Sequence, residues 1–347
     1  MNLHETPMAQ LLGQLQQWET RRTEANAFYK QGKYKEYLDL SRQNLRLSRE
    51  MQDRTREGHA LNDVGLAYIH CWQPQKALEF FYQGLSRTQE LGDKQGEATS
   101  YCNLGSSYNH LGQLSLALEF FSRALPIFKS LGDTQGEIST LNNIALIHTK
   151  LDEPKRALLL HYQILAMRRM LSDFSGEATT LNGIGFAYTA MGKSEQALGF
   201  FQEALSIQRA IKNLSGEATT LNNIASIYSD MGQPKEALLL YHQILLTRKE
   251  IRDRSGEANT LHNIGFTYSL LGERKQALSF YNKAINRFRD LGDCLGEIST
   301  LLNIGSVYAT MNQKEWAQSY YKDARKLSEQ IDHKPLVERV KRLMDAL

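Results

Sequence analysis

The sequence predicts an all-α protein, a solenoid of stacked helical hairpins, and three recurring features predict it. Glutamate returns every forty residues without insertion or deletion, at Glu57, Glu97, Glu137, Glu177, Glu217, Glu257 and Glu297. Alanine keeps the same step from Ala77 to Ala317. A small residue, followed three positions later by an aromatic residue or once by histidine, keeps it from Gly65 to Gly305. A period of this length is typical of repeats made of two helices.

Each forty-residue unit is expected to hold two helices, which we call helix A and helix B. In the unit that begins at Asp93, this aspartate is the expected N-cap and Glu97 falls in the first turn, where negative charge suits the helix dipole. Helix A then runs to about Leu111 and helix B to about Leu131. Glycine at the inner turn can take the left-handed conformation that ends a helix. The inner-turn glycines are Gly112, Gly192, Gly232 and Gly272, and Trp72, Asp152 and Asn312 replace them in other units.

Helical spacing predicts how the two helices pack. At about 100° per residue, one stripe of helix A and one stripe of helix B face each other. The helix A stripe of this unit is Tyr101, Leu104, Gly105 and Tyr108, and the helix B stripe is Ala117, Phe121, Ala124 and Leu125. The glycine lets helix B approach closely, and small residues opposite large ones allow interdigitation. One hairpin cannot bury both of its faces, so neighbouring hairpins must stack.

The order small, aromatic, alanine, aromatic, small resembles the tetratricopeptide repeat family. The forty-residue length, and phrases such as GEATTLNNI at 216–224, resemble the long-repeat subgroup of Partner-of-Inscuteable adaptors, kinesin light chains and cyanobacterial repeat proteins. The resemblance implies a right-handed superhelical solenoid of about eight hairpins with helix A on the concave side. We expect a helical extension over 1–16, the solenoid over 17–332 and a capping helix over 333–347. The first unit is degenerate, with Tyr37 at the alanine position.

Composition excludes several classes of function. A net charge of +3 gives no strong attraction to nucleic acid or to an anionic membrane. Three scattered cysteines form no disulfide framework, which favours a reducing compartment. The N-terminus lacks the pattern of a signal peptide, and no apolar run approaches the roughly 18 residues of a membrane helix. We expect a cytoplasmic protein that binds no nucleic acid and no membrane.

Asparagines recur on the face of helix A opposite the core, which we call the helix A face. They are Asn103, Asn143, Asn223, Asn263 and Asn303, in a row begun by Asp63 and interrupted by Gly183. Asparagine costs about 0.6 kcal/mol relative to alanine in an exposed helix interior. An amide side chain can both donate to and accept from an extended peptide backbone. In several tetratricopeptide families asparagines at this position clamp peptides, so the resemblance implies the same for these five.

The same asparagines have a second interpretation. They could bond neighbouring helices and set the pitch of the solenoid, or be inherited copies of one ancestral unit. A second row of polar residues could serve either as a ligand clamp or as a structural link between helices. It comprises Asn62, Asn142, Asn182 and Asn222, with His262 in register. Binding specificity is expected from residues of the face that do not repeat, namely His59, Asp63, Phe186, Asp230 and Phe266. The two phenylalanines could receive apolar ligand side chains or be covered by an adjacent unit.

Basic residues that end many second helices allow two roles. They include Arg87, Arg168, Arg169, Arg209, Arg248, Lys249, Arg287 and Arg289. They suit the negative end of the helix dipole, and a strip that binds an acidic partner is the alternative.

Catalytic and metal-binding motifs are missing from the sequence. The nine histidines form no HExxH or other metal-ligand spacing, and no phosphate-binding loop or nucleophile motif is present. We expect no enzyme activity, no metal and no cofactor. The sequence favours a scaffold or adaptor that binds a protein or peptide in the concave groove. The alternatives are a sensory or regulatory subunit that gates a separate effector enzyme on ligand binding, and an enzyme.

Overall fold

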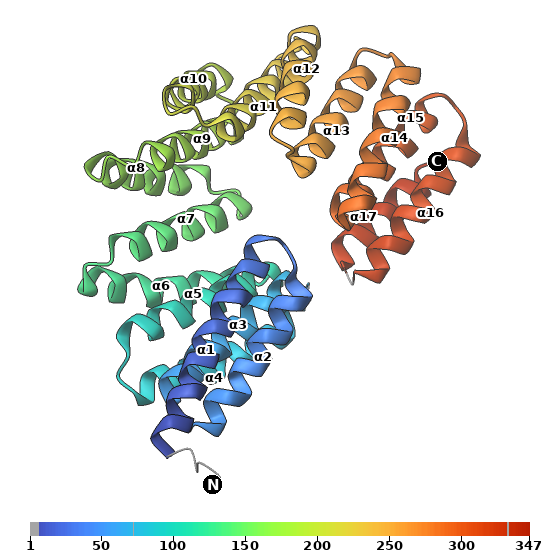
Figure 1. The fold of residues 1–347 in the computed structure, drawn as a ribbon. Coiled ribbons are helices and arrows are strands. Elements are labelled where there is room, and N and C mark those ends of the chain that lie inside the picture. The colour runs from blue at the N-terminus through green and yellow to red at the C-terminus, as the bar shows by residue number, and fades with distance from the viewer. Residues whose placement is uncertain (1–6, 72, 332) are drawn as a thin grey trace. The chain divides into compact units, whose positions relative to one another are not determined.

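The computed structural model describes residues 7–347 apart from 72 and 332, and every element in these residues is a helix (Figure 1). The chain divides into two compact units, Met1–Met167 and Arg168–Leu347, and the boundary falls inside α8 (Pro154–Met170). Each unit is a stack of antiparallel helical hairpins. The predicted all-α fold of repeated hairpins is therefore confirmed.

The helices alternate between the two predicted kinds, and each helix A precedes its helix B. Helices A are α1 (Pro7–Lys30), α3 (Arg54–His70), α5 (Lys94–His110), α7 (Thr134–Lys150), α9 (Phe174–Ala190), α11 (Leu214–Asp230), α13 (Arg254–Leu270) and α15 (Cys294–Thr310). Helices B are α2 (Tyr34–Glu50), α4 (Pro74–Glu90), α6 (Leu114–Leu131), α8, α10 (Ser194–Ala210), α12 (Pro234–Glu250), α14 (Arg274–Leu291) and α16 (Lys314–Gln330). A last helix, α17 (Lys334–Asp345), follows them.

Local signals start and stop these helices as the sequence predicted. The Asp93 carboxylate accepts the backbone N–H of Gly96 at 2.9 Å and so caps α5. Gly112 ends that helix with φ +72°. Asp152 and Asn312, which replace the glycine, take the same left-handed conformation at +59° and +58°. The replacement at Trp72 lies outside the described residues.

Close packing between helix A and helix B explains the recurring small residue. A Cβ atom added to Gly185 on α9 would lie 2.5 Å from the ring of Phe201 on α10, well inside van der Waals contact. Gly105 and Phe121 have the same relationship in the first unit at 2.9 Å. Phe121 and Phe201 are almost completely buried. The predicted pairing of a small residue with a large ring is therefore confirmed.

Ion pairs connect the end of one helix B to the start of the next helix A. The Nε atom of Arg209 on α10 donates to Oε1 of Glu217 on α11 at 2.8 Å. Arg289 and Glu297 repeat this contact at 2.6 Å. Arg169 with Glu177 repeats this link, and Arg168 and Arg248 pair with the N-cap aspartates Asp173 and Asp253 of the next helix A. Arg87 and Arg287 instead pair with Glu57 and Glu257 inside their own hairpins. The repeated glutamate thus places a negative charge in the first turn of helix A, and at Glu217 and Glu297 it also links two hairpins.

The two ends of the described chain are helical. α1 runs without a break from Pro7 to Lys30, so residues 7–16 continue into the first helix A. Tyr37, at the alanine position of the first hairpin, is buried in a cluster with Ala25 and Ala67. α17 packs on α16, and its Val340 is completely buried beside Tyr321 and Ala324. The domain boundaries that we drew at residues 16 and 332 remain predictions.

Candidate functional site

Asparagines of the helix A face join consecutive repeats in both units. In the first unit the Nδ2 atom of Asn103 on α5 donates to Oδ1 of Asn62 on α3 at 3.3 Å. In the second unit Asn263 donates to Asn222 at 2.9 Å, and the Nδ2 atom of Asn223 lies 3.5 Å from Oδ1 of Asn182. Three amides of the first row, Asn103, Asn223 and Asn263, therefore donate to the second row of the preceding repeat.

The second row reaches onward to the next helix A. The Asn182 amide donates to the hydroxyl of Thr220 at 2.9 Å. His262 takes the same place, with its Nδ1 atom 2.8 Å from the Thr300 hydroxyl and its Nε2 atom 3.2 Å from Asn303. Burial lowers the pKa of His262 to about 4, so the ring is neutral near pH 7. Because the Asn303 amide can only donate through nitrogen, the neutral ring accepts through Nε2 and donates through Nδ1.

These contacts change the expected exposure of the amides. We expected the first row to be exposed, but Asn223 is buried and Asn103, Asn143, Asn263 and Asn303 are half-buried. In the second row Asn62 and Asn182 are buried, and Asn142 and Asn222 are half-buried. The bonds between repeats support the structural interpretation of these asparagines. Their use as a peptide clamp stays a prediction.

The non-repeating residues of the second unit's helix A face are more accessible. Phe186 on α9 is 51 % exposed and Phe266 on α13 is 43 % exposed. The Phe186 ring packs edge-on against the buried Phe201 with 5.7 Å between centroids, which fixes its position while leaving one side open. Asp230, at the end of α11, is exposed. An aromatic ring that is held in place yet half exposed is suited to contact with an apolar partner.

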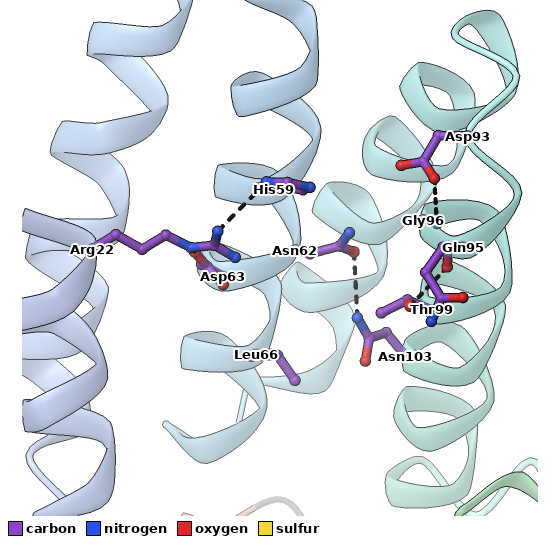
Figure 2. A pocket seen from close by; sticks show the side chains of 10 residues that line it. All are labelled: Arg22, His59, Asn62, Asp63, Leu66, Asp93, Gln95, Gly96, Thr99 and Asn103. Atoms are coloured by element: carbon purple, nitrogen blue, oxygen red, sulfur yellow. Dashed lines mark hydrogen bonds and ion pairs between the residues drawn. The ribbon is translucent and has the colours of Figure 1, made fainter. Parts of the chain in front are cut away.

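A pocket of about 440 Å³ lies on the first unit's helix A face, between α1, α3 and α5 (Figure 2). Its lining comprises Arg22, His59, Asn62, Asp63, Leu66, Asp93, Gln95, Gly96, Thr99 and Asn103. The structure therefore brings the predicted residues His59 and Asp63 together with one bonded pair of asparagines. Arg22, which sequence reasoning missed, joins them from α1; it lies in the degenerate first unit, where no repeat position marks it.

The chemistry of this pocket centres on Asp63. Its carboxylate lies 3.3 Å from Nε of Arg22 and accepts the Tyr37 hydroxyl at 3.4 Å. Burial raises the pKa of Asp63, although Arg22 acts in the opposite direction. Burial and the Arg22 charge together lower the pKa of His59, whose Nδ1 atom lies 3.5 Å from Arg22 Nη1. The pocket thus holds the neutral imidazole of His59 and the carboxylate of Asp63. The Arg22 guanidinium contacts both groups and compensates the carboxylate only in part.

Metal-binding clusters and membrane-spanning helices are both absent from the part of the chain that the structure describes. Within residues 7–347, apart from 72 and 332, no group of three or more His, Cys, Asp or Glu side chains is placed to hold a metal ion. In the same residues no helix is both long and apolar enough to cross a membrane.

The hairpins and their contacts define a protein built of helical-hairpin repeats. The sequence model of the tetratricopeptide repeat family matches residues 57–130, 96–170, 176–250 and 256–330. These matches cover more than half of the chain, which therefore belongs to that family.

Solved structures share this fold at low sequence identity. The apo form of the quorum sensor NprR from B. thuringiensis has a TM-score of 0.63 and 19% identity, covering 92% of this chain and 98% of its own. Aspartyl phosphate phosphatase F from Bacillus subtilis has a TM-score of 0.65 and 14% identity, covering 87% and 76%. A Rap protein complexed with competence and sporulation factor has a TM-score of 0.59 and 13% identity, covering 95% and 97%. At these identities the likeness shows the fold alone. A search of curated proteins found no match.

Proposed function

We propose that this chain is a non-catalytic adaptor that binds a protein or peptide partner on its helix A face. The observation that carries the proposal is the pair of half-exposed rings, Phe186 and Phe266, on α9 and α13 of the second unit. Large aromatic side chains contribute much of the binding energy where proteins meet. Both rings stand beside amides that already connect the repeats, so the surface around them is positioned in advance.

Membership of the tetratricopeptide family and the similar folds agree with this proposal. The Rap protein was solved as a complex with competence and sporulation factor, so this fold serves binding in that protein. The half-buried asparagines Asn103, Asn263 and Asn303 each contact the preceding repeat and keep further polar capacity, because an amide offers two N–H groups and a carbonyl oxygen. Asn143 is half-buried too. We include them as secondary contacts to a ligand backbone.

A regulatory function is the second candidate. NprR is described as a quorum sensor, and its fold covers 92% of this chain. In this version a ligand on the helix A face would change the shape of the solenoid and so gate a separate effector enzyme. Small-angle scattering with and without the purified partner separates the two functions, because an adaptor keeps its radius of gyration and a switch changes it.

The proposed function is tested by comparing two pairs of exposed apolar residues in the same unit. A partner captured with the wild-type chain is purified, and its Kd is measured by calorimetry. The double variant Phe186→Ala/Phe266→Ala is expected to bind at least tenfold more weakly. The matched control is Leu239→Ala/Leu246→Ala on α12, where both leucines are exposed, at 75 % and 69 %. Equal affinities of the phenylalanine variant and the wild type would contradict binding on this face.

A further inference from the structure

The pocket of the first unit differs from the rest of the helix A face in the charge at one repeat position. Asp63 stands where five later repeats carry asparagine, at Asn103, Asn143, Asn223, Asn263 and Asn303. The exchange replaces a neutral amide with a carboxylate inside a cavity of about 440 Å³. Pockets that bind small ligands measure roughly 300–1,000 Å³. The cavity therefore has room for a ligand group next to a charge that the other repeats lack.

The protein itself compensates this carboxylate incompletely. The Asp63 side chain is only 15% exposed, and its two partners, Arg22 Nε and the Tyr37 hydroxyl, lie at 3.3 and 3.4 Å. Charge-assisted bonds are usually shorter, at about 2.7–2.9 Å. The raised pKa of Asp63 agrees with this geometry, because desolvation outweighs the nearby guanidinium.

Arg22 is shared among several groups. Its guanidinium carbon lies 5.3 Å from the Trp18 ring, in a cation–π contact, and its Nη1 atom faces His59. Its side chain is 34% exposed and extends from α1 toward Asp63 (Figure 2). A second cation can therefore approach Asp63 without displacing a buried arginine.

The opposite wall is rich in hydrogen-bond acceptors. Asp93 presents a second carboxylate, and the Thr99 hydroxyl donates to the Gln95 carbonyl, which leaves its lone pairs free to accept (Figure 2). The Nδ2 atom of Asn103 donates a hydrogen bond to Asn62, and its side-chain carbonyl oxygen remains an acceptor. Asp63 and Asp93 carry two negative charges against the single positive charge of Arg22, since His59 is neutral. A group that fits this wall must donate several hydrogen bonds and carry positive charge.

We propose that this pocket binds a cationic nitrogen group, the guanidinium or ammonium of a basic side chain on the partner. The bound group would donate to Asp63 and to the acceptors of α5, and the Leu66 side chain would contact its aliphatic stem. This inference rests on the proposed function, because it names a chemical feature of the partner. It concerns the first unit alone and is tested without the partner.

The test is an NMR titration of the ¹⁵N-labelled full chain with N-acetyl-L-arginine amide, which carries one positive charge and no free termini. N-acetyl-L-citrulline amide is the matched neutral probe, and N-acetyl-L-lysine amide separates guanidinium from ammonium binding. The side-chain amides of Asn62 and Asn103 report on the site. We expect saturable shifts of both amides with the cationic probes, and at least fivefold weaker binding of the citrulline probe.

Two variants with opposite expected effects exclude a merely structural explanation. Asp63→Asn installs the residue that five other repeats carry, so it preserves the fold, and it should weaken binding of the arginine probe at least tenfold. Arg22→Gln removes the competing internal cation and should tighten binding at least twofold. Asp323→Asn, at an exposed position on α16, is the control and should leave binding unchanged.

Each outcome decides the proposal. Equal binding of the arginine and citrulline probes, or an Asp63→Asn variant that binds the arginine probe as well as the wild type does, would overturn it. So would weaker binding by Arg22→Gln, because removal of a competing guanidinium should favour, not oppose, the binding of a cationic probe. A saturating titration combined with failure of the Phe186→Ala/Phe266→Ala experiment would keep the cation pocket and reject the two phenylalanines as contacts of the partner.

Discussion

The Nε2 atom of His262 accepts a hydrogen bond from the Asn303 amide at 3.2 Å, and this bond requires a neutral ring. His262 stands at the position of Asn182 and Asn222, and like Asn182 it contacts both a threonine and an asparagine of the next repeat. Its burial lowers its pKa from 6.5 to about 4. Protonation would turn the acceptor into a donor that faces another donor.

We therefore predict that His262 makes the protein less stable in mild acid. At this position the unfolded chain binds a proton near pH 6.5, and the folded chain only near pH 4. The free energy that the neutral His262 ring contributes to folding is therefore complete above pH 6.5 and is lost as the pH falls toward 4. At pH 5 the loss from this one group is about 2 kcal/mol. His262→Asn keeps both bonds without titrating. Urea unfolding at pH 7 and pH 5 should show a smaller difference for the variant, and identical pH dependence in both proteins would refute this role.

Alanine at Asn223 and Asn263 is predicted to destabilise the stack of repeats. Each substitution leaves a carbonyl oxygen, of Asn182 or Asn222, without its donor. An unsatisfied buried polar group costs about 1–3 kcal/mol. The sequence left these asparagines open between a peptide clamp and a structural role, and their bonds between repeats favour a contribution to stability. Circular dichroism melting tests it, with the exposed Asn259→Ala on α13 as control. A variant that melts with the wild type would show that the bonds between repeats contribute nothing.

The architecture could be predicted from the sequence because its rules are local. Asp93 caps α5 and Gly112 ends it through contacts within a few residues, and the forty-residue period repeats these signals along the chain. The amide partners could not be predicted in the same way. Asn103 and Asn62 are 41 residues apart, so their meeting depends on the register between two packed helices. Arg22 was missed because the first repeat has diverged and its positions no longer align with the others.

Overpacking at Gly185 is predicted to destabilise its hairpin. The Gly185→Leu side chain would begin 2.5 Å from the Phe201 ring, and the ring is completely buried and cannot move away freely. Overpacking of this kind costs about 1–3 kcal/mol. Gly199→Leu on α10 of the same hairpin is the matched control, because its Cβ would meet nothing within 4 Å. If both variants have the same melting temperature, the contact between α9 and Phe201 is not as tight as the structure indicates.

The turn after α10 holds a residue in a conformation that suits glycine. Lys212 has φ +54°, whereas the equivalent turn after α4 uses Gly92 at φ +67°. A left-handed conformation costs a residue with a Cβ about 1–2 kcal/mol. Lys212→Gly is therefore predicted to stabilise the protein by about 1 kcal/mol, and Gly92→Lys to destabilise it by a similar amount. Chemical denaturation of both variants measures the two changes, which should have opposite signs.

The ion pair between Arg209 and Glu217 has a consequence for how such a chain lengthens. Three forty-residue segments end in Arg169, Arg209 or Arg289, and each of these arginines pairs with the glutamate at the start of the next segment. Unequal recombination that inserts one more segment therefore creates a new junction with both charges already matched. Growth of the array by such a segment needs no compensating mutation at this ion pair.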